Sequence, residues 1–259
     1  MNVGDAMSFF RDLWIVFARA MRLSLRNPAW VVIGLLQPVL YLVLFGPLLV
    51  RVASLPGFPP GDAWTVFVPG LLIQLGMFGA AFVGFGLIAD LRAGVIERMR
   101  VTPASRVALL GGRVLHDVVV VFAQGAILVV AALAFGFRAP VPAVLLGLAL
   151  ISVLAAAFSF LSYAAALWLK SEDALAPLAN AVALPLLLLS GILLPMSLAP
   201  GWLELIANIN PIKHVVDGAR AIFRAEFLSS ASLSGIVIAL VLVAVSGWIG
   251  VWMFRREAS

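Results

Sequence analysis

Six apolar runs, each about as long as a membrane span, constrain this chain more than any other feature. None of their residues is charged, and they cover residues 29–50, 64–89, 118–137, 141–169, 174–194 and 232–254. A helix of about 20 residues crosses a hydrocarbon layer of about 30 Å. Because 64% of the 259 residues are hydrophobic and only 11% are charged, water cannot be the main solvent of this chain. The sequence therefore predicts an all-α integral membrane protein with six transmembrane helices, built as one domain over residues 1–259.

The basic residues divide unevenly between the two sides of these predicted spans. With the N-terminus in the cytoplasm, most of the 17 Lys and Arg residues lie inside, and the outer ones are Arg51, Arg138, Lys213, Arg220 and Arg224. Membrane proteins keep Lys and Arg on their cytoplasmic side, so this division predicts that both termini are cytoplasmic. The net charge of +5 has the same explanation, and we expect no nucleic-acid partner.

An amphipathic helix is predicted before the first span, over residues 7–27. Its apolar residues recur at helical spacing, and its arginines lie mostly on the other side. The apolar set is Phe10, Trp14, Phe17, Met21 and Leu25, and the basic set is Arg11, Arg19, Arg22 and Arg26. This pattern is typical of a helix lying in the membrane interface beside anionic lipid. The alternative is a soluble helix packed on another domain.

The segment 90–106 is charged although it separates two apolar runs, and it contains "RAGVIERMRVTPASR". Residues 96–100 fit one or two helical turns, and Pro103 restricts Thr102 and suits the start of a new helix. We expect the third helix to begin inside the cytoplasm near Ser105, before its span at 118–137, with Arg113 and Asp117 paired at i, i+4 spacing. The alternative is that this loop only anchors the topology.

The connection 195–230 is too long for a turn and too charged to cross the membrane. It predicts two short extracytoplasmic helices, re-entrant or amphipathic, separated by Asn210-Pro211. In the second helix, apolar residues occupy one face and charged residues the opposite face. The charged set is Lys213, Asp217, Arg220 and Arg224.

Several catalytic motifs are absent from the sequence. A phosphate-binding G-x-x-x-x-G-K-[ST] loop fails at Lys170, because Leu169 and Ala164 occupy the glycine positions. Neither G-x-S-x-G nor H-E-x-x-H occurs, and the chain has no cysteine. We therefore expect no catalytic residues, no metal site and no cofactor in this chain. A protein of this kind forms a pathway and takes its energy from elsewhere.

Two blocks of sequence resemble the ABC-2 type transporter permeases, and most of all the daunorubicin-resistance-type drug-export permeases. The first, "DLRAGVIERMRVTPASRVALLGGRVLHDVV", has the acidic residue, the glycine, the basic stretch, T-P-x-S-R and G-R of their cytoplasmic loop. The second, "LLLLSGILLPMSLAPGWLELIANINPIKHVVDGARAIF", has the small residues, N-P and late D-x-x-R of their C-terminal block. The resemblance extends over nearly the whole chain.

This resemblance implies a permease subunit in the plasma membrane of a prokaryote. It would pair with a second permease copy, identical or related, and with a separate ATP-binding-cassette ATPase subunit that holds ATP and Mg²⁺. Residues 90–106 would be the coupling helix, with arginines meeting acidic or backbone groups of the ATPase and Ile96 and Met99 supplying apolar contact. The implied coupling residues are Gly94, Ile96, Glu97, Arg98, Met99, Arg100, Thr102, Pro103 and Arg106.

The family's transport cavity is lined chiefly by spans one, two and five. Carried onto this sequence, the polar candidates in that pathway are Gln37, Tyr41, Gln74 and Asn180. So apolar a lining favours export of a hydrophobic or amphiphilic cargo such as a drug, an antibiotic or a lipid. Two alternatives remain open: a permease that exports lipid-linked polysaccharide, and an autonomous secondary transporter.

Overall fold

The computed structural model describes residues 3–54, 58–94 and 105–257, and all regular structure in these ranges is helical. The predicted all-α class is thus confirmed for the described part of the chain. Its long helices are α1 (Val3–Arg26), α2 (Ala29–Val52), α3 (Ala63–Ala81), α6 (Arg106–Ala134), α7 (Val141–Leu169), α8 (Glu172–Leu188) and α11 (Ser230–Glu257). The shorter ones are α4 (Gly84–Arg92), η1 (Met196–Leu198), α9 (Gly201–Ala207) and α10 (Pro211–Phe223).

Five stretches of the described residues are long and apolar enough to cross a membrane. They are Val31–Val52, Ala63–Arg92, Val107–Ala134, Val141–Leu169 and Ser230–Arg256. The helix α7 has the bounds that the sequence predicts, because Pro140 and Pro142 start it and Lys170 ends it in the left-handed conformation at φ 52°. The predicted span 174–194 is shorter as a helix: α8 has 17 residues, ends at Leu188 and is not among the five.

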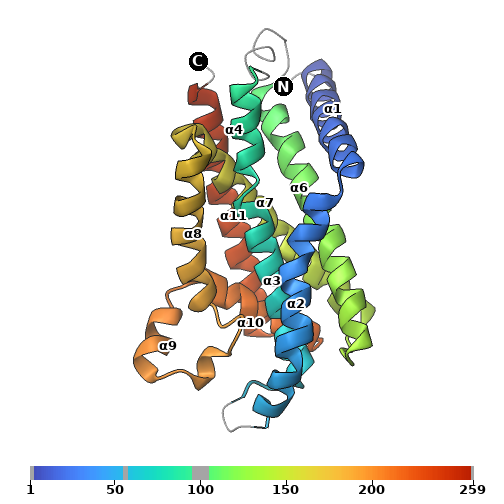
Figure 1. Cartoon of the computed structure of the whole chain (residues 1–259), viewed down its shortest axis with the longest axis vertical. Helices are drawn as coiled ribbons and strands as arrows, with labels where there is room; N and C mark the ends of the chain where they lie inside the picture. Colours follow the sequence, from blue (N-terminus) through green and yellow to red (C-terminus); the bar gives the residue numbers. More distant parts are fainter. Residues whose placement is uncertain (1–2, 55–57, 95–104, 258–259) are drawn as a thin grey trace.

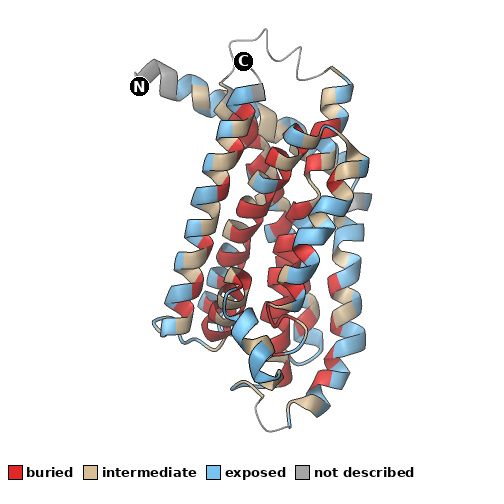
Figure 2. Cartoon of the chain, turned by 90° about the vertical axis from the view of Figure 1, so that its left-hand side faces the viewer, coloured by how far each residue is buried: buried red, intermediate tan, exposed pale blue. Residues whose placement is uncertain are grey.

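The helices form an upright bundle with both chain termini at one end and α9 and α10 near the other (Figure 1). We call these the terminal end and the α10 end. The helix α7 packs against α11, α3 and α6, and α10 packs across α11 and α3. Buried residues gather on the inner faces of the bundle, and exposed ones cover its outside (Figure 2). The outer faces stay apolar, as on Leu44 of α2, Val130 of α6 and Trp248 of α11, which fits lipid as the surrounding solvent.

The predicted span 64–89 is broken in the structure between α3 and α4. A helix break frees backbone polar groups, and in a membrane no water is present to satisfy them. Ser162 of α7 satisfies two of these backbone groups. Its hydroxyl donates to the Ala81 carbonyl (2.7 Å) and accepts from the Gly84 amide (2.9 Å). The hydroxyl therefore holds α3, α4 and α7 together at the break.

The helix α1 lies against α6 at the terminal end (Figure 1). Leu13 and Val16 pack on Gly112 of α6. A second face is apolar and exposed, with Phe10 and Trp14. The arginines at 11, 19, 22 and 26 are exposed as well. The helix thus has one face for the protein, one apolar outer face and one basic face.

Candidate functional site

The predicted coupling segment can be located by its two ends. Ile96, Glu97, Arg98, Met99, Arg100, Thr102 and Pro103 lie outside the described residues. Before them, Gly94 closes the last turn of α4 in the left-handed conformation, at φ 65°. After them, Ser105 is the N-cap of α6 and Arg106 its first residue, so the helix that carries the third span begins where the sequence predicts. Polar contacts cluster around both ends.

Two ion pairs fix the end of α4 to its neighbours. Asp90 pairs with Arg113 of α6, and both side chains are mostly buried. Arg92 Nη1 lies 3.3 Å from Glu172 Oε1 at the start of α8, where both side chains are exposed. The predicted pairing of Arg113 with Asp117 is therefore wrong. Asp90 lies on another helix, so the i, i+4 spacing of residues along one helix cannot predict this pair.

The start of α6 is bound by α1. The Ser105 amide donates to Asp12 Oδ2 at 3.2 Å, and the Ser105 side chain makes no capping bond of its own. The free amides of a helix start need an acceptor, and a carboxylate there also suits the helix dipole. Asp12 thus caps α6 from a position 93 residues earlier in the chain.

A series of hydrogen-bonded side chains joins α1, α6 and α7 one level deeper, in which Asp117 and Tyr163 are buried and His116 and Ser24 are partly buried. The Tyr163 hydroxyl donates to Asp117 Oδ2 at 2.7 Å, and Asp117 is 6% exposed. His116 Nδ1 lies 3.0 Å from Asp117 Oδ1, and His116 Nε2 lies 2.7 Å from the Ser24 hydroxyl. With Nδ1 protonated, the imidazole donates to Asp117 and accepts from Ser24, so each of these four side chains has a hydrogen-bond partner.

These contacts form one set, which we call the terminal-end network. It connects both ends of the segment 95–104 with α1, α7 and α8. Its members are Asp12, Ser24, Asp90, Arg92, Ser105, Arg113, His116, Asp117, Tyr163 and Glu172. Sequence reasoning misses most of it, although an acidic residue entering a span, as Asp117 does, is the signal that a buried partner exists. Among the described residues, no three His, Asp or Glu side chains come together as a metal-binding group.

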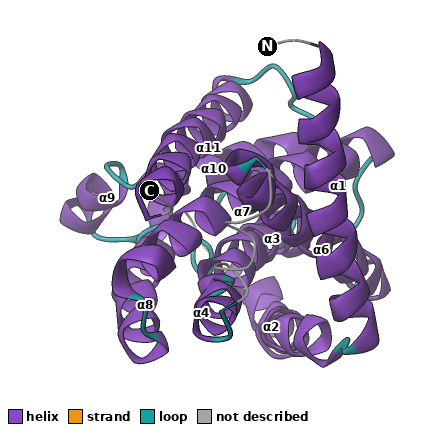
Figure 3. Ribbon diagram, turned by 90° about the horizontal axis from the view of Figure 1, so that it is seen from above, coloured by secondary structure: helices purple, strands orange, loops and turns teal. Residues whose placement is uncertain are grey.

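The four predicted pathway residues are not brought into one site. Gln37 and Tyr41 are neighbours on α2, where Gln37 Nε2 donates to the Tyr41 hydroxyl at 3.3 Å. Asn180 is exposed on α8. Gln74 of α3 is 1% exposed, and neither amide atom has a hydrogen-bond partner among the described residues. Seen from above, α2, α4 and α8 stand in a row along one side of the bundle (Figure 3).

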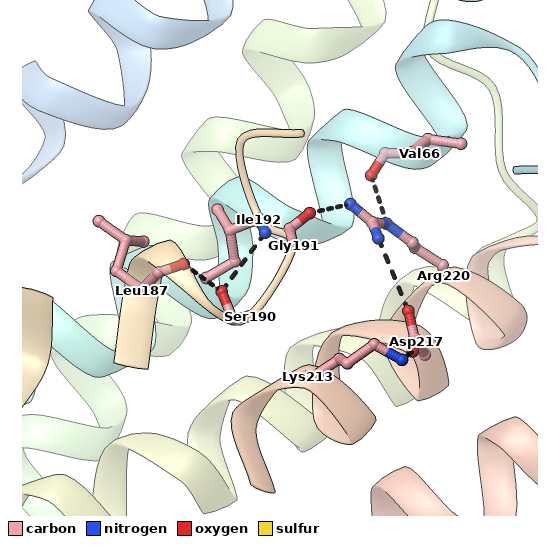
Figure 4. Close-up of polar contacts among 8 residues, drawn as sticks. All are labelled: Val66, Leu187, Ser190, Gly191, Ile192, Lys213, Asp217 and Arg220. Atoms are coloured by element: carbon pink, nitrogen blue, oxygen red, sulfur yellow. Dashed lines mark hydrogen bonds and ion pairs between the residues drawn. The ribbon is translucent and has the colours of Figure 1, made fainter. Parts of the chain in front are cut away.

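At the α10 end, Arg220 occupies a position that the sequence does not predict. The amphipathic pattern assigns it to the polar face of its helix, but the residue is 4% exposed. Its Nε donates to the Val66 carbonyl (3.0 Å), and its Nη2 donates to the Gly191 carbonyl (2.7 Å), as Figure 4 shows. Arg220 lies at the edge of the apolar face, one turn after Val216, where α3 and the loop after α8 supply the carbonyls that it binds.

The charge of Arg220 is partly balanced by its own helix. Asp217 Oδ1 lies 3.6 Å from Arg220 Nη1, and Asp217 Oδ2 lies 3.3 Å from Lys213 Nζ (Figure 4). Burial lowers the pKa of Arg220 to about 10, Asp217 opposes this change and Arg224 adds to it. The guanidinium therefore stays charged at neutral pH. A buried charge of this kind is tolerated only where hydrogen bonds and a counter-charge compensate the lost water.

Comparison with known proteins gives one consistent result. A family model described as ABC-2 type transporter matches residues 11–223. A protein of Cyanophora paradoxa, named as a candidate transport permease (ycf38), is 24% identical over 258 residues, which cover 96% of this chain and 89% of the relative. Its namesake in Porphyra purpurea is 29% identical over 76% of this chain and 69% of the relative. The daunorubicin resistance ABC transporter permease protein DrrB1 of Streptomyces coeruleorubidus is 27% identical over 60% of this chain and 55% of its own length.

Proposed function

The chain belongs to the ABC-2 type transporter family, and from this premise we propose that it is the transmembrane permease subunit of an ATP-binding-cassette exporter. A separate ATPase subunit supplies the energy, since the chain has no phosphate-binding loop. The observation that carries the proposal is the terminal-end network. It ties the two ends of the segment 95–104 to α1, α7 and α8, as a segment that transmits movement requires.

We place both termini in the cytoplasm of a prokaryotic cell, with the protein in its plasma membrane. Because the termini lie at one end of the bundle, the chain crosses an even number of times (Figure 1). Five spans are long and apolar enough by themselves, and α8 is the natural sixth. Its 17 residues extend about 25 Å, just short of a hydrocarbon layer of about 30 Å. The helix α1 then lies in the cytoplasmic interface, with α9 and α10 on the outer side.

In this orientation the segment 95–104 faces the cytoplasmic ATPase. Glu97, Arg98 and Arg100 would meet charged or backbone groups of the ATPase, with Ile96 and Met99 in apolar contact. Closure of two ATPase subunits is a two-state change, and it would pull on both ends of the segment. The pairs Asp90–Arg113 and Arg92–Glu172 then pass the movement to α6 and α8.

The row of α2, α4 and α8 supports a pathway on that side of the bundle, closed by a second permease copy (Figure 3). Gln37 and Tyr41 of α2 and Asn180 of α8 would contribute polar groups to an otherwise apolar lining. Gln74 of α3 would lie behind them. A lining with so few polar groups suits a hydrophobic or amphiphilic cargo such as a drug, an antibiotic or a lipid.

Co-expression with its ATP-binding-cassette partner tests this function. We expect a stable complex of two permeases and two ATPases whose ATP hydrolysis rises when a hydrophobic cargo is added. The same complex in proteoliposomes should export that cargo only when ATP and Mg²⁺ are present. Transport by the purified chain in ATP-free liposomes would contradict the proposal and favour a secondary transporter.

A further inference from the structure

Arg220 connects three parts of the chain that approach one another only at the α10 end. It lies on α10, its Nε bonds to the first turn of α3 at Val66, and its Nη2 bonds to the loop after α8 at Gly191. These two carbonyls lie 154 and 29 positions away in the chain. A single guanidinium therefore holds the end of α8 against α3 (Figure 4).

The loop that Arg220 holds is shaped to receive it. The Ser190 hydroxyl donates to the Leu187 carbonyl (2.6 Å) and accepts from the Ile192 amide (3.3 Å), which ends α8 in a tight turn. Gly191 has a φ of +76°, a conformation that suits glycine and turns its carbonyl towards Arg220. On the α3 side, a Cβ at Gly70 would lie only 2.8 Å from the Ile192 carbonyl, so the loop touches the helix backbone.

From this geometry we propose that Arg220 is a latch that closes the exit of the permease at the α10 end. It keeps the loop 189–195 on α3 while the protein rests. The proposal rests on the proposed function, in which α8 borders the cargo pathway and moves away from α3 at this end to release the cargo. Opening breaks the bonds of Arg220 to Gly191 and Val66. Asp217, which is half-exposed and also bound by Lys213, keeps the released guanidinium paired.

A cysteine reporter tests the latch directly, since the chain has no cysteine of its own. Ile192 is 1% exposed and takes part in the turn only through its backbone amide, so Ile192→Cys places a buried thiol in the loop without removing a side-chain hydrogen bond. A membrane-impermeant maleimide added outside should not label it in the resting protein. Leu194→Cys, at a residue 53% exposed on the same loop, should be labelled throughout, and Val68→Cys, at a residue 0% exposed on α3, should never be labelled.

The decisive comparison needs no ATP. In the Ile192→Cys background, Arg220→Gln should raise the labelling rate on the order of tenfold for each charged hydrogen bond lost. Arg220→Lys should raise it too, because an ammonium lacks the fork that reaches both carbonyls. The matched control is Arg224→Gln on the same helix, since Arg224 binds Glu226 in an exposed turn, and it should leave the thiol protected.

A second comparison keeps Arg220 unchanged, so that a variant that fails to fold cannot decide the result. In the complex with its ATPase, the Ile192→Cys thiol should become labelled during ATP turnover and stay protected without ATP. Arg220→Gln should also hydrolyse ATP with less cargo exported per ATP, whereas a purely structural role would lower both. Any of three results would overturn the latch. The thiol could be equally protected in Arg220→Gln and its parent, it could be labelled at rest, or it could stay protected throughout active export. Failure to bind any ATPase would instead overturn the proposed function, and the ATP-free comparison would still stand.

Discussion

The Tyr163 hydroxyl donates a hydrogen bond of 2.7 Å to the carboxylate of Asp117, and this bond joins α7 to α6 near the terminal end of the bundle. The Asp117 carboxylate is also hydrogen-bonded to His116, and His116 is hydrogen-bonded to Ser24 of α1. This buried carboxylate therefore links α6 directly to α7, and it links both helices to α1 through His116. Hydrogen bonds to a charged group are stronger than neutral ones, and losing one leaves the charge short of a partner.

Tyr163→Phe should lower the free energy of unfolding by about 1.5–3 kcal/mol, because it removes one hydrogen bond from a buried carboxylate. The matched control is Tyr41→Phe, at the only other tyrosine, whose contact to Gln37 is longer and exposed. That change should cost less than about 0.5 kcal/mol. Thermal unfolding of both variants in the same detergent measures the difference. Equal losses would show that Asp117 does not depend on Tyr163.

Ser162→Ala should destabilise the break between α3 and α4 by about 1–3 kcal/mol, because it leaves the Ala81 carbonyl and the Gly84 amide without their partner. Ser152→Ala on the same helix is the control, since its hydroxyl bonds only to the carbonyl one turn earlier, at Leu148. We expect a change below about 0.5 kcal/mol there. Proteolysis of the native protein at increasing temperature compares the two variants. A Ser162→Ala protein as stable as the parent would show that the Ser162 hydroxyl does not stabilise the break.

The pair Asp90–Arg113 should couple more strongly than the pair Arg92–Glu172. The side chains of Asp90 and Arg113 are 31% and 17% exposed, and those of Arg92 and Glu172 are 57% and 42% exposed. Exposed pairs contribute about 0.2–1 kcal/mol, whereas a mostly buried, charged hydrogen bond contributes about 1.5–3 kcal/mol. Double-mutant cycles with Asp90→Asn and Arg113→Gln, and with Glu172→Gln and Arg92→Gln, measure both. A larger coupling energy in the exposed pair would refute this ranking.

Glu226 gives a prediction for pH. The hydrogen bonds from Arg224 lower the pKa of the Glu226 carboxyl, and burial opposes this change slightly. A lowered pKa in the folded state means that the pair stabilises the protein at neutral pH and loses this effect as pH falls through the lowered pKa. Glu226→Gln should therefore reduce the melting temperature slightly at pH 7 and make no difference in acid. A difference that persists in acid would mean that the charge is not responsible.

Much of this fold can be predicted because apolar length and turn residues act locally. The span 141–169 has its predicted bounds, since proline starts it and Lys170 ends it in a left-handed turn. The start of α6 after Ser105 follows equally from Thr102-Pro103 and the charge pattern. Helix α8 was harder to predict. Its apolar run continues to Leu194, but the turn made by Ser190 and Gly191 ends the helix at Leu188.

The polar contacts could not be predicted, because they join residues far apart in the chain. Spacing on one helix favoured Arg113 with Asp117, whereas the fold offers Asp90 and Tyr163 as better partners. Arg220 shows the same limit. A helical wheel gives the angle of a side chain, but only the packing of α3 and of the loop after α8 decides that this angle is buried.

We propose that residues 95–104 connect this permease to a separate ATPase. Charge reversal tests it most directly, with Glu97→Arg and Arg98→Glu made singly in the purified complex and Arg51→Glu near the opposite end as the control. We predict that both coupling variants insert and fold but lose cargo-stimulated ATP hydrolysis at least about tenfold, the effect of breaking a charged contact at an interface. Arg51→Glu should retain it. Normal cargo-stimulated hydrolysis and export in Glu97→Arg and Arg98→Glu would show that residues 95–104 do not couple the permease to the ATPase.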